Sequence, residues 1–320
     1  MATGVSSRTV EHLAWWTAWA ALAELVVLRM VTRTLIHIPG LADFEAPIVA
    51  VSEVGRLAYY VTVVLLICLL VLLVGGYGRL HSTGSILIRA GFATILLLAF
   101  LGRVGLIDAA DIGGPTMAGF IVMAAGIAFA GWRALPVLVL IVATYASGSA
   151  GTLQGSGGGL SGESFGSLIR FGEIAAVVGC LLLPLVLDKP LSRRALVMGL
   201  GVAALVTAIL SVASSTLTIL ILWSFGLPAS LPAAIYGLAA GSVVAVTATA
   251  IQDGGRGLAA GVLLAVAGGV SFVSTYQTAL LAAGLGLIAL NIAPSPRPLV
   301  NASSSSDDGE VSMRPSLGWP

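Results

Sequence analysis

The sequence predicts an all-α, polytopic bundle of transmembrane helices, and three observations support this fold class. Apolar residues make up 58% of the 320 residues, whereas charged residues make up only 9%. The mean hydropathy of +1.05 lies far above that of soluble domains. The apolar residues also form long runs, as helices that cross a bilayer require.

A helix needs about 20 mostly apolar residues to cross the hydrocarbon core of a bilayer. Suitable runs occupy 13–36, 57–76, 85–104, 116–131, 134–149, 167–187, 195–225, 231–251 and 257–293. The last run would be about 55 Å long as one helix, which exceeds a core of about 30 Å. We therefore divide it near Ser271–Thr275 and expect about ten spans, with a range of nine to eleven.

The run 195–225 is also too long for an upright span. Polar residues at its midpoint leave two interpretations open: one tilted or kinked helix, or two short half-helices. These polar residues are Ser211, Ser214, Ser215 and Thr216.

The distribution of basic residues predicts the orientation, because cytoplasmic loops are enriched in lysine and arginine. With the N-terminus inside, most basic residues are cytoplasmic: Arg8, Arg79, Arg89, Arg133, Lys189, Arg193, Arg194, Arg256, Arg297 and Arg314. Arg33, Arg56 and Arg103 fall outside, and Arg29 and Arg170 lie within helices. We expect both termini in the cytoplasm and the protein in the cell membrane.

The expected organisation has two membrane halves of about five helices each, at 1–150 and 167–293. A Gly/Ser-rich extracytoplasmic connector at 151–166 separates them, and a Pro- and Ser-rich segment at 294–320 is expected to be a disordered cytoplasmic tail. An odd number of spans per half is the number expected for an inverted-repeat transporter. The 40 glycines lie largely within apolar runs and predict closely packed helices.

Within the connector, "GGGLSGES" at 157–164 resembles a phosphate-binding loop with Glu163 in place of the lysine. Such a loop follows a strand and needs the lysine charge, whereas this one follows a membrane span on the outer face. We therefore expect no nucleotide there.

Several function classes are not supported by the composition. The net charge of +1 with scattered basic residues argues against nucleic-acid binding. No catalytic triad, paired-carboxylate site or zinc motif is evident, so we expect no enzymatic activity. We predict no cofactor, with haem b or copper as the alternative, for which His12 and His81 near the inner ends of the first two helices are the candidate ligands.

Ionisable residues inside the bilayer are costly and mark functional sites. Glu24 lies near the middle of the first span, and Arg29 follows five residues later, off its helical face. Arg170 and Glu173 in the sixth span are spaced i, i+3 and can form a pair. We select Glu24, Arg170 and Glu173 as transport candidates, and Glu24 foremost, because no neighbour on its own helix clearly neutralises it.

The region from about Ala134 to Ile251 resembles the copper-resistance protein D family of polytopic membrane proteins. The similarity rests on "ALPVLVLIVATYASGSAG", "SLIRFGEIAAVVGCLLLPLVL" and "LPAAIYGLAAGSVVAVTATAI". It implies copper or haem handling. Histidines usual in the family are replaced here by "ASGSAG" and "LIRFGE", so no binding residue is assigned from it.

Together these features predict a multi-pass protein that transports a small solute or ion through a helix bundle. The alternative is a non-catalytic membrane subunit that anchors or stabilises a membrane complex, including a redox complex linked to haem or copper. The expected partners are the lipid bilayer, an unidentified solute and, under the alternative, other membrane subunits.

Overall fold

The computed structural model describes residues 7–31, 45–74, 77, 82–155, 162–213, 215–224, 230–269 and 275–292. These residues form helices joined by short turns, with no strand among them. In chain order the helices are α1 (Ser7–Glu24), the π-helix η1 (Leu25–Val31), α3 (Glu45–Val74), α4 (Ser82–Arg103), α5 (Ala109–Ala128), η2 (Gly131–Ala134), α6 (Leu135–Gly155), α7 (Gly162–Leu182), η3 (Leu183–Val186), α8 (Arg193–Val212), α9 (Ser215–Ser224), α10 (Ala233–Gln252), α11 (Arg256–Gly268) and α12 (Thr275–Asn291).

Within the described ranges, eight helical segments are long and apolar enough to cross a membrane. They are 7–31, 49–73, 83–102, 111–128, 131–148, 166–186, 193–212 and 233–252. Two further apolar helices, α11 and α12, are shorter. An all-α chain with the helices of a multi-pass membrane protein is thereby confirmed.

The structure divides both overlong runs of the sequence. The run 195–225 is divided at its polar midpoint into α8 of 20 residues and α9 of 10 residues. This agrees with the two-helix alternative in the place of the break, but α8 is full-length and not a half-helix. The run 257–293 becomes α11 and α12, and the break expected near Ser271–Thr275 is confirmed because α11 ends at Gly268 and α12 begins at Thr275.

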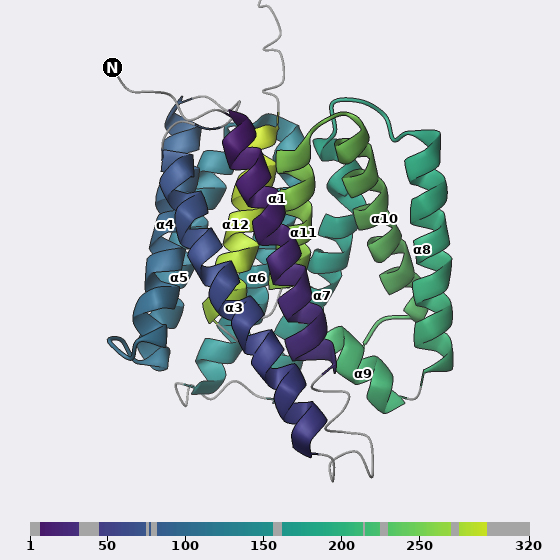
Figure 1. The fold of residues 1–320 in the computed structure, drawn as a ribbon, viewed down its shortest axis with the longest axis horizontal. Coiled ribbons are helices and arrows are strands. Elements are labelled where there is room, and N and C mark those ends of the chain that lie inside the picture. The colour runs from purple at the N-terminus through teal and green to yellow at the C-terminus, as the bar shows by residue number, and fades with distance from the viewer. Residues whose placement is uncertain are drawn as a thin grey trace, which may run out of the picture.

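Long helices that are close in the chain pack side by side as antiparallel pairs, and the short α9 lies in the chain between the two members of one pair (Figure 1). The pairs are α1 with α3, α4 with α5, α6 with α7, α8 with α10, and α11 with α12. Glycines allow this close approach: a Cβ atom added at Gly199 would lie 2.6 Å from the Gly241 carbonyl oxygen, and one at Gly284 would lie 2.3 Å from the Ala265 nitrogen. The prediction of glycine-mediated packing is confirmed.

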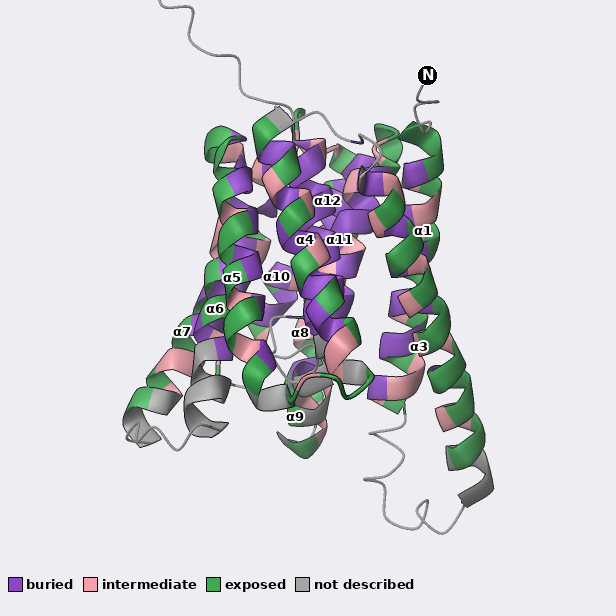
Figure 2. Ribbon diagram, turned by 90° about the vertical axis from the view of Figure 1, so that its left-hand side faces the viewer, coloured by how far each residue is buried: buried purple, intermediate pink, exposed green. Residues whose placement is uncertain are grey.

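The core is built around α12, in which every residue from 276 to 290 is buried. Figure 2 shows the buried residues concentrated on α11 and α12 in the middle of the bundle. A helix that is apolar on all sides must be surrounded by lipid or by protein, and here α11 and α4 pack directly against it. The C-terminal hairpin is therefore an internal element.

The two expected halves differ in how their helices pair. If the chain were an inverted repeat, α3 and α4 would correspond to α8 and α10. Yet α8 packs along α10, whereas α3 and α4 touch only sparsely. Helix pairing therefore gives no support to an inverted repeat.

The boundary between the halves is only partly described. Helices α6 and α7 extend into the 151–166 stretch as far as Gly155 and from Gly162. Residues 156–161, most of the phosphate-loop-like stretch, and the 294–320 tail lie outside the described residues.

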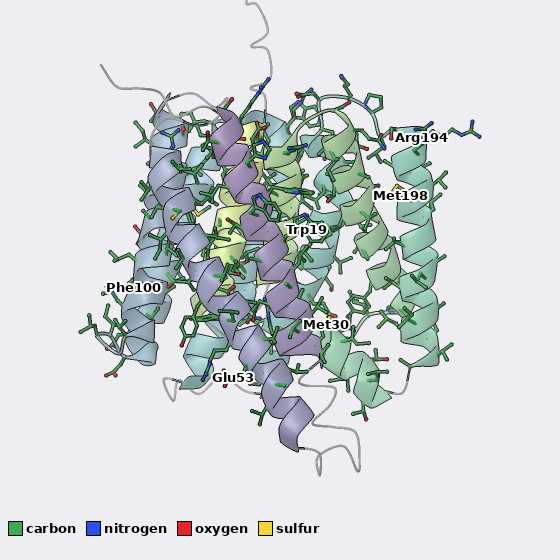
Figure 3. All side chains as sticks on the ribbon, viewed as in Figure 1. Trp19, Met30, Glu53, Phe100, Arg194 and Met198 are labelled. Carbon is green, nitrogen blue, oxygen red and sulfur yellow. The ribbon has the colours of Figure 1, made fainter. Side chains whose placement is uncertain are left out.

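Both described ends of the chain, at the start of α1 and the end of α12, lie at the same end of the bundle (Figure 1). Ion pairs between short loops tie this end together. Arg133 pairs with Asp188, and Lys189 Nζ lies 3.6 Å from Asp253 Oδ1. Figure 3 shows Arg194 at this same end, and Glu53 on α3 towards the other.

Candidate functional site

A change of helix type places two buried charges of the first span in contact. Arg29 Nε and Nη2 donate to Glu24 Oε2 at 3.3 and 2.9 Å, and only 2% of Glu24 and 6% of Arg29 is exposed. In an α-helix, residues five apart are separated by about 140° around the axis. The π-helix η1 begins directly after Glu24 and brings residues i and i+5 into line. The expectation that Arg29 lies off the face of Glu24 is therefore wrong.

Arg29 also contacts the C-terminal hairpin. Its Nη2 donates to the carbonyl oxygen of Ala267 at 2.6 Å, in the last turn of α11, where helical carbonyls lack partners within the helix. Ala267 is eleven residues after Arg256, about 16 Å along α11, which is close to half of a hydrocarbon core of about 30 Å. The ion pair thus lies near the level at which α11 ends inside the bundle.

The first turn of α12 supplies a further polar group. Tyr276 is 8% exposed, and its hydroxyl is buried without a hydrogen-bond partner of normal geometry, although the Thr62 side chain lies nearby. The same hydroxyl is within electrostatic reach of Glu24 and Arg29. On its other side the Tyr276 ring packs edge-on against Tyr59 of α3, with centroids 4.5 Å apart. We call Glu24, Arg29, the Ala267 carbonyl and Tyr276 the hairpin-tip cluster.

An apolar cleft approaches the cluster between α3, α4 and α12. Its lining includes Tyr59, Val63, Leu96, Phe100 and Tyr276. Phe100 is 49% exposed, so the cleft opens on the outer surface of the bundle, where a multi-pass membrane protein meets lipid.

The second buried carboxylate has a different environment. Glu173 of α7 is 2% exposed and accepts hydrogen bonds from the Ser230 backbone nitrogen at 3.4 Å, from the Ser230 hydroxyl and from the Tyr236 hydroxyl. Tyr236 in turn accepts from the Leu231 backbone nitrogen at 3.2 Å. Glu173 therefore fixes α7 to the segment that begins α10.

Arg170 and Glu173 lie within electrostatic reach of each other but do not form the close pair that their spacing permits. Arg170 is exposed, and neither a hydrogen bond nor an ion pair joins it to Glu173 among the described residues. The i, i+3 spacing permits a pair on an isolated helix, but here the carboxylate is turned inward to neutral donors while the longer guanidinium reaches the surface. Of the three transport candidates, only Glu24 belongs to the hairpin-tip cluster.

The described residues include only one of the two histidine candidates. His12 is exposed on α1, and His81 lies outside the described residues. The described ranges contain no group of three or more His, Cys, Asp or Glu side chains that could hold a metal ion.

Sequence reasoning missed Tyr276, the Ala267 carbonyl, Ser230 and Tyr236. The polar stretch that divides the 257–293 run could have indicated Tyr276 and the Ala267 carbonyl, because it marks where two short helices turn inside the bundle. No sequence pattern indicated the π-helix, since its residues are apolar apart from Arg29.

Comparison of the chain with protein families, with curated protein sequences and with solved structures gives no match.

Proposed function

We propose that this chain is a membrane transporter that moves a small solute or ion, with the hairpin-tip cluster as its binding centre. This function is supported above all by the burial of Glu24 and Arg29 beside the end of a short helix within the bundle. Charged side chains at membrane depth are costly to maintain and characteristically belong to transport pathways.

The form of the hairpin supports the same function. Helix α11 has 13 residues and α12 has 17, about 20 and 25 Å, so each is short for a full crossing. Transporters characteristically build their sites where interrupted helices end near the midplane, because helix ends there offer free backbone groups. The hairpin is held at its base by the Tyr77 hydroxyl, 3.0 Å from Asn291 Oδ1, and at its tip by Arg29.

We further propose that the ten spans expected from the sequence are eight full crossings and a pair of shorter membrane-embedded helices, α11 and α12, with both termini in the cytoplasm of a cell membrane. The grouping of Arg133, Lys189, Arg194 and Arg256 in the loops and helix starts at the end where α1 begins supports this orientation.

Flux measurements on the purified protein in proteoliposomes test the proposal. A panel of radiolabelled anions, cations and neutral solutes identifies one that the wild type accumulates. We expect Glu24→Gln to abolish that flux while the protein stays folded. The matched control is Glu53→Gln on α3, whose side chain is 53% exposed, and which should keep wild-type flux. Unchanged flux in Glu24→Gln rejects the role of the cluster.

The alternative remains a membrane subunit, and α3 provides a specific observation in its favour. This helix has 30 residues, about 45 Å, so it extends beyond a hydrocarbon core and offers a surface for a partner. The resemblance to the copper-resistance protein D family would make that complex haem- or copper-linked. A stable co-purifying protein or a haem absorbance band after extraction in mild detergent favours this function over transport.

A further inference from the structure

The ion pair of the hairpin-tip cluster has one member that can lose its charge. Arginine stays protonated in proteins, whereas a carboxylate can take up a proton. A buried guanidinium cannot remain without a counter-ion in a low-dielectric interior. When Glu24 is protonated, an anion bound at Arg29 would restore the charge balance of the pair.

Arg29 has a second contact, to a group that does not titrate. Its Nη2 donates to the Ala267 carbonyl at 2.6 Å, at the negative end of the α11 dipole. This contact does not depend on the charge of Glu24. A different carboxylate would meet the guanidinium at the same place, with the planar donor geometry that suits one.

The start of α12 adds two features that favour an anion. Gly268 at the end of α11 packs against α12 between Gln277 and Leu281, since an added Cβ would lie 2.4 Å from the Leu281 nitrogen and 2.8 Å from the Gln277 carbonyl oxygen. The first N–H groups of a helix lack partners within it and carry the positive end of its dipole. The Tyr276 hydroxyl in this turn is buried, without a hydrogen-bond partner of normal geometry, and close enough to interact electrostatically with Arg29.

We infer that the hairpin-tip cluster binds a small monovalent carboxylate together with one proton. The inference rests on the proposed function and names its substrate class. The ligand carboxylate takes the place of Glu24 on Arg29 and accepts from the Tyr276 hydroxyl, while the proton is transferred to Glu24. One negative and one positive charge enter together, so the net charge of the site is unchanged.

Other ionisable groups near the pair do not supply the proton acceptor. Among the described residues, the groups that interact with Glu24 and Arg29 include Tyr276 on α12 and, packed on Tyr276, Tyr59 on α3. Both are phenols, which are neutral and protonated at physiological pH. Glu53 and Arg56, which flank the contact of Gly55 with Leu28, are exposed and paired with each other. Helix α11 contributes the Ala267 carbonyl, which does not titrate.

Binding of acetate to the purified full-length protein in detergent tests the inference without requiring transport. Thermal unfolding is followed with acetate or chloride at equal ionic strength. In Glu24→Gln, the neutral side chain reproduces the protonated state, so acetate should raise the Tm in a saturable way with an apparent affinity at least about tenfold higher than in the wild type, about 1.4 kcal/mol. Chloride should not reproduce the effect.

Glu24→Ala serves as a second variant, in which formate or acetate fills the space of the lost carboxylate and should restore the Tm. Adding Arg29→Gln to either variant should abolish the response. If acetate stabilises the Arg29→Gln double variants as strongly as the single ones, or no better than chloride does, the inference is overturned.

Proton uptake separates the coupling from simple anion binding. In weakly buffered solution with a pH indicator, wild-type protein should take up one proton per acetate bound, and Glu24→Gln should take up none. Acetate binding without proton uptake in the wild type overturns the coupling. If the protein binds acetate together with a proton but shows no flux in proteoliposomes, the inference about binding stands and the transport function is refuted.

Discussion

Glu24 and Arg29 form a buried ion pair although they are five residues apart in one helical segment, because the helix changes from α to π directly after Glu24. The π turn compensates the angular offset that an α-helix would impose. The pair also touches the last turn of α11 through Ala267. A local change in helix geometry thus links the first span to the last hairpin.

Removing only one member of this pair should be more damaging than removing both. Arg29→Gln leaves Glu24 buried without its cation, and we expect a loss of about 3–5 kcal/mol in stability. Glu24→Gln combined with Arg29→Gln leaves neutral amides and should lose less. Thermal unfolding of the four proteins in detergent, treated as a double-mutant cycle, measures the difference. If Arg29→Gln and the double variant lose the same amount of stability, Glu24 and Arg29 do not interact as a buried ion pair.

The α8–α10 contact offers a matched test of glycine packing on a single helix. Gly199→Ala places a methyl group 2.6 Å from the Gly241 carbonyl oxygen and should destabilise the protein by about 1–3 kcal/mol. At Gly201, on the same helix, an added Cβ meets nothing within 4 Å, so Gly201→Ala should be neutral or stabilise by up to about 1 kcal/mol. Unfolding temperatures compare the two, and equal effects would refute the close contact.

Glu173 is expected to contribute to stability, in contrast to Arg170. Tyr236→Phe removes the hydroxyl that donates to Glu173 and accepts from the Leu231 backbone nitrogen, so we expect a loss of about 1–3 kcal/mol. Arg170→Gln changes an exposed side chain and should stay within about 0.5 kcal/mol of wild type. The unfolding temperature checks both, and a larger loss for Arg170→Gln would support the ion pair that the structure lacks.

The proposed orientation predicts which single cysteines react with a membrane-impermeant thiol reagent in intact cells. In a background carrying Cys68→Ala and Cys180→Ala, Ser164→Cys at the exposed start of α7 should be labelled from outside. Lys189→Cys, at a position where the lysine side chain is 71% exposed, should be labelled only after the cells are permeabilised. The reverse pattern would invert the topology.

The membrane class of the fold and most helix positions could be predicted from the sequence, because the length of an apolar run reports directly on a bilayer-spanning helix. The break in 257–293 followed from the same length argument. The division of 195–225 did not, since its polar midpoint allowed several outcomes. Within the candidate site, Glu24 could be found from the sequence because a lone carboxylate stands out in an apolar run. Its contact with Arg29 could not be predicted, because it depends on a π-helix, which the spacing rules for α-helices do not include.

The sequence by itself determined the all-helical membrane architecture, the break in the last apolar run and the close packing of glycine-bearing faces. Only the tertiary structure decided that α12 is the central helix, since an apolar helix surface suits lipid and protein core equally well. It likewise decided the partners of the two buried carboxylates. Glu24 meets Arg29 and Glu173 meets Ser230 and Tyr236 because a buried charge takes whichever donors the packing of distant segments brings within reach.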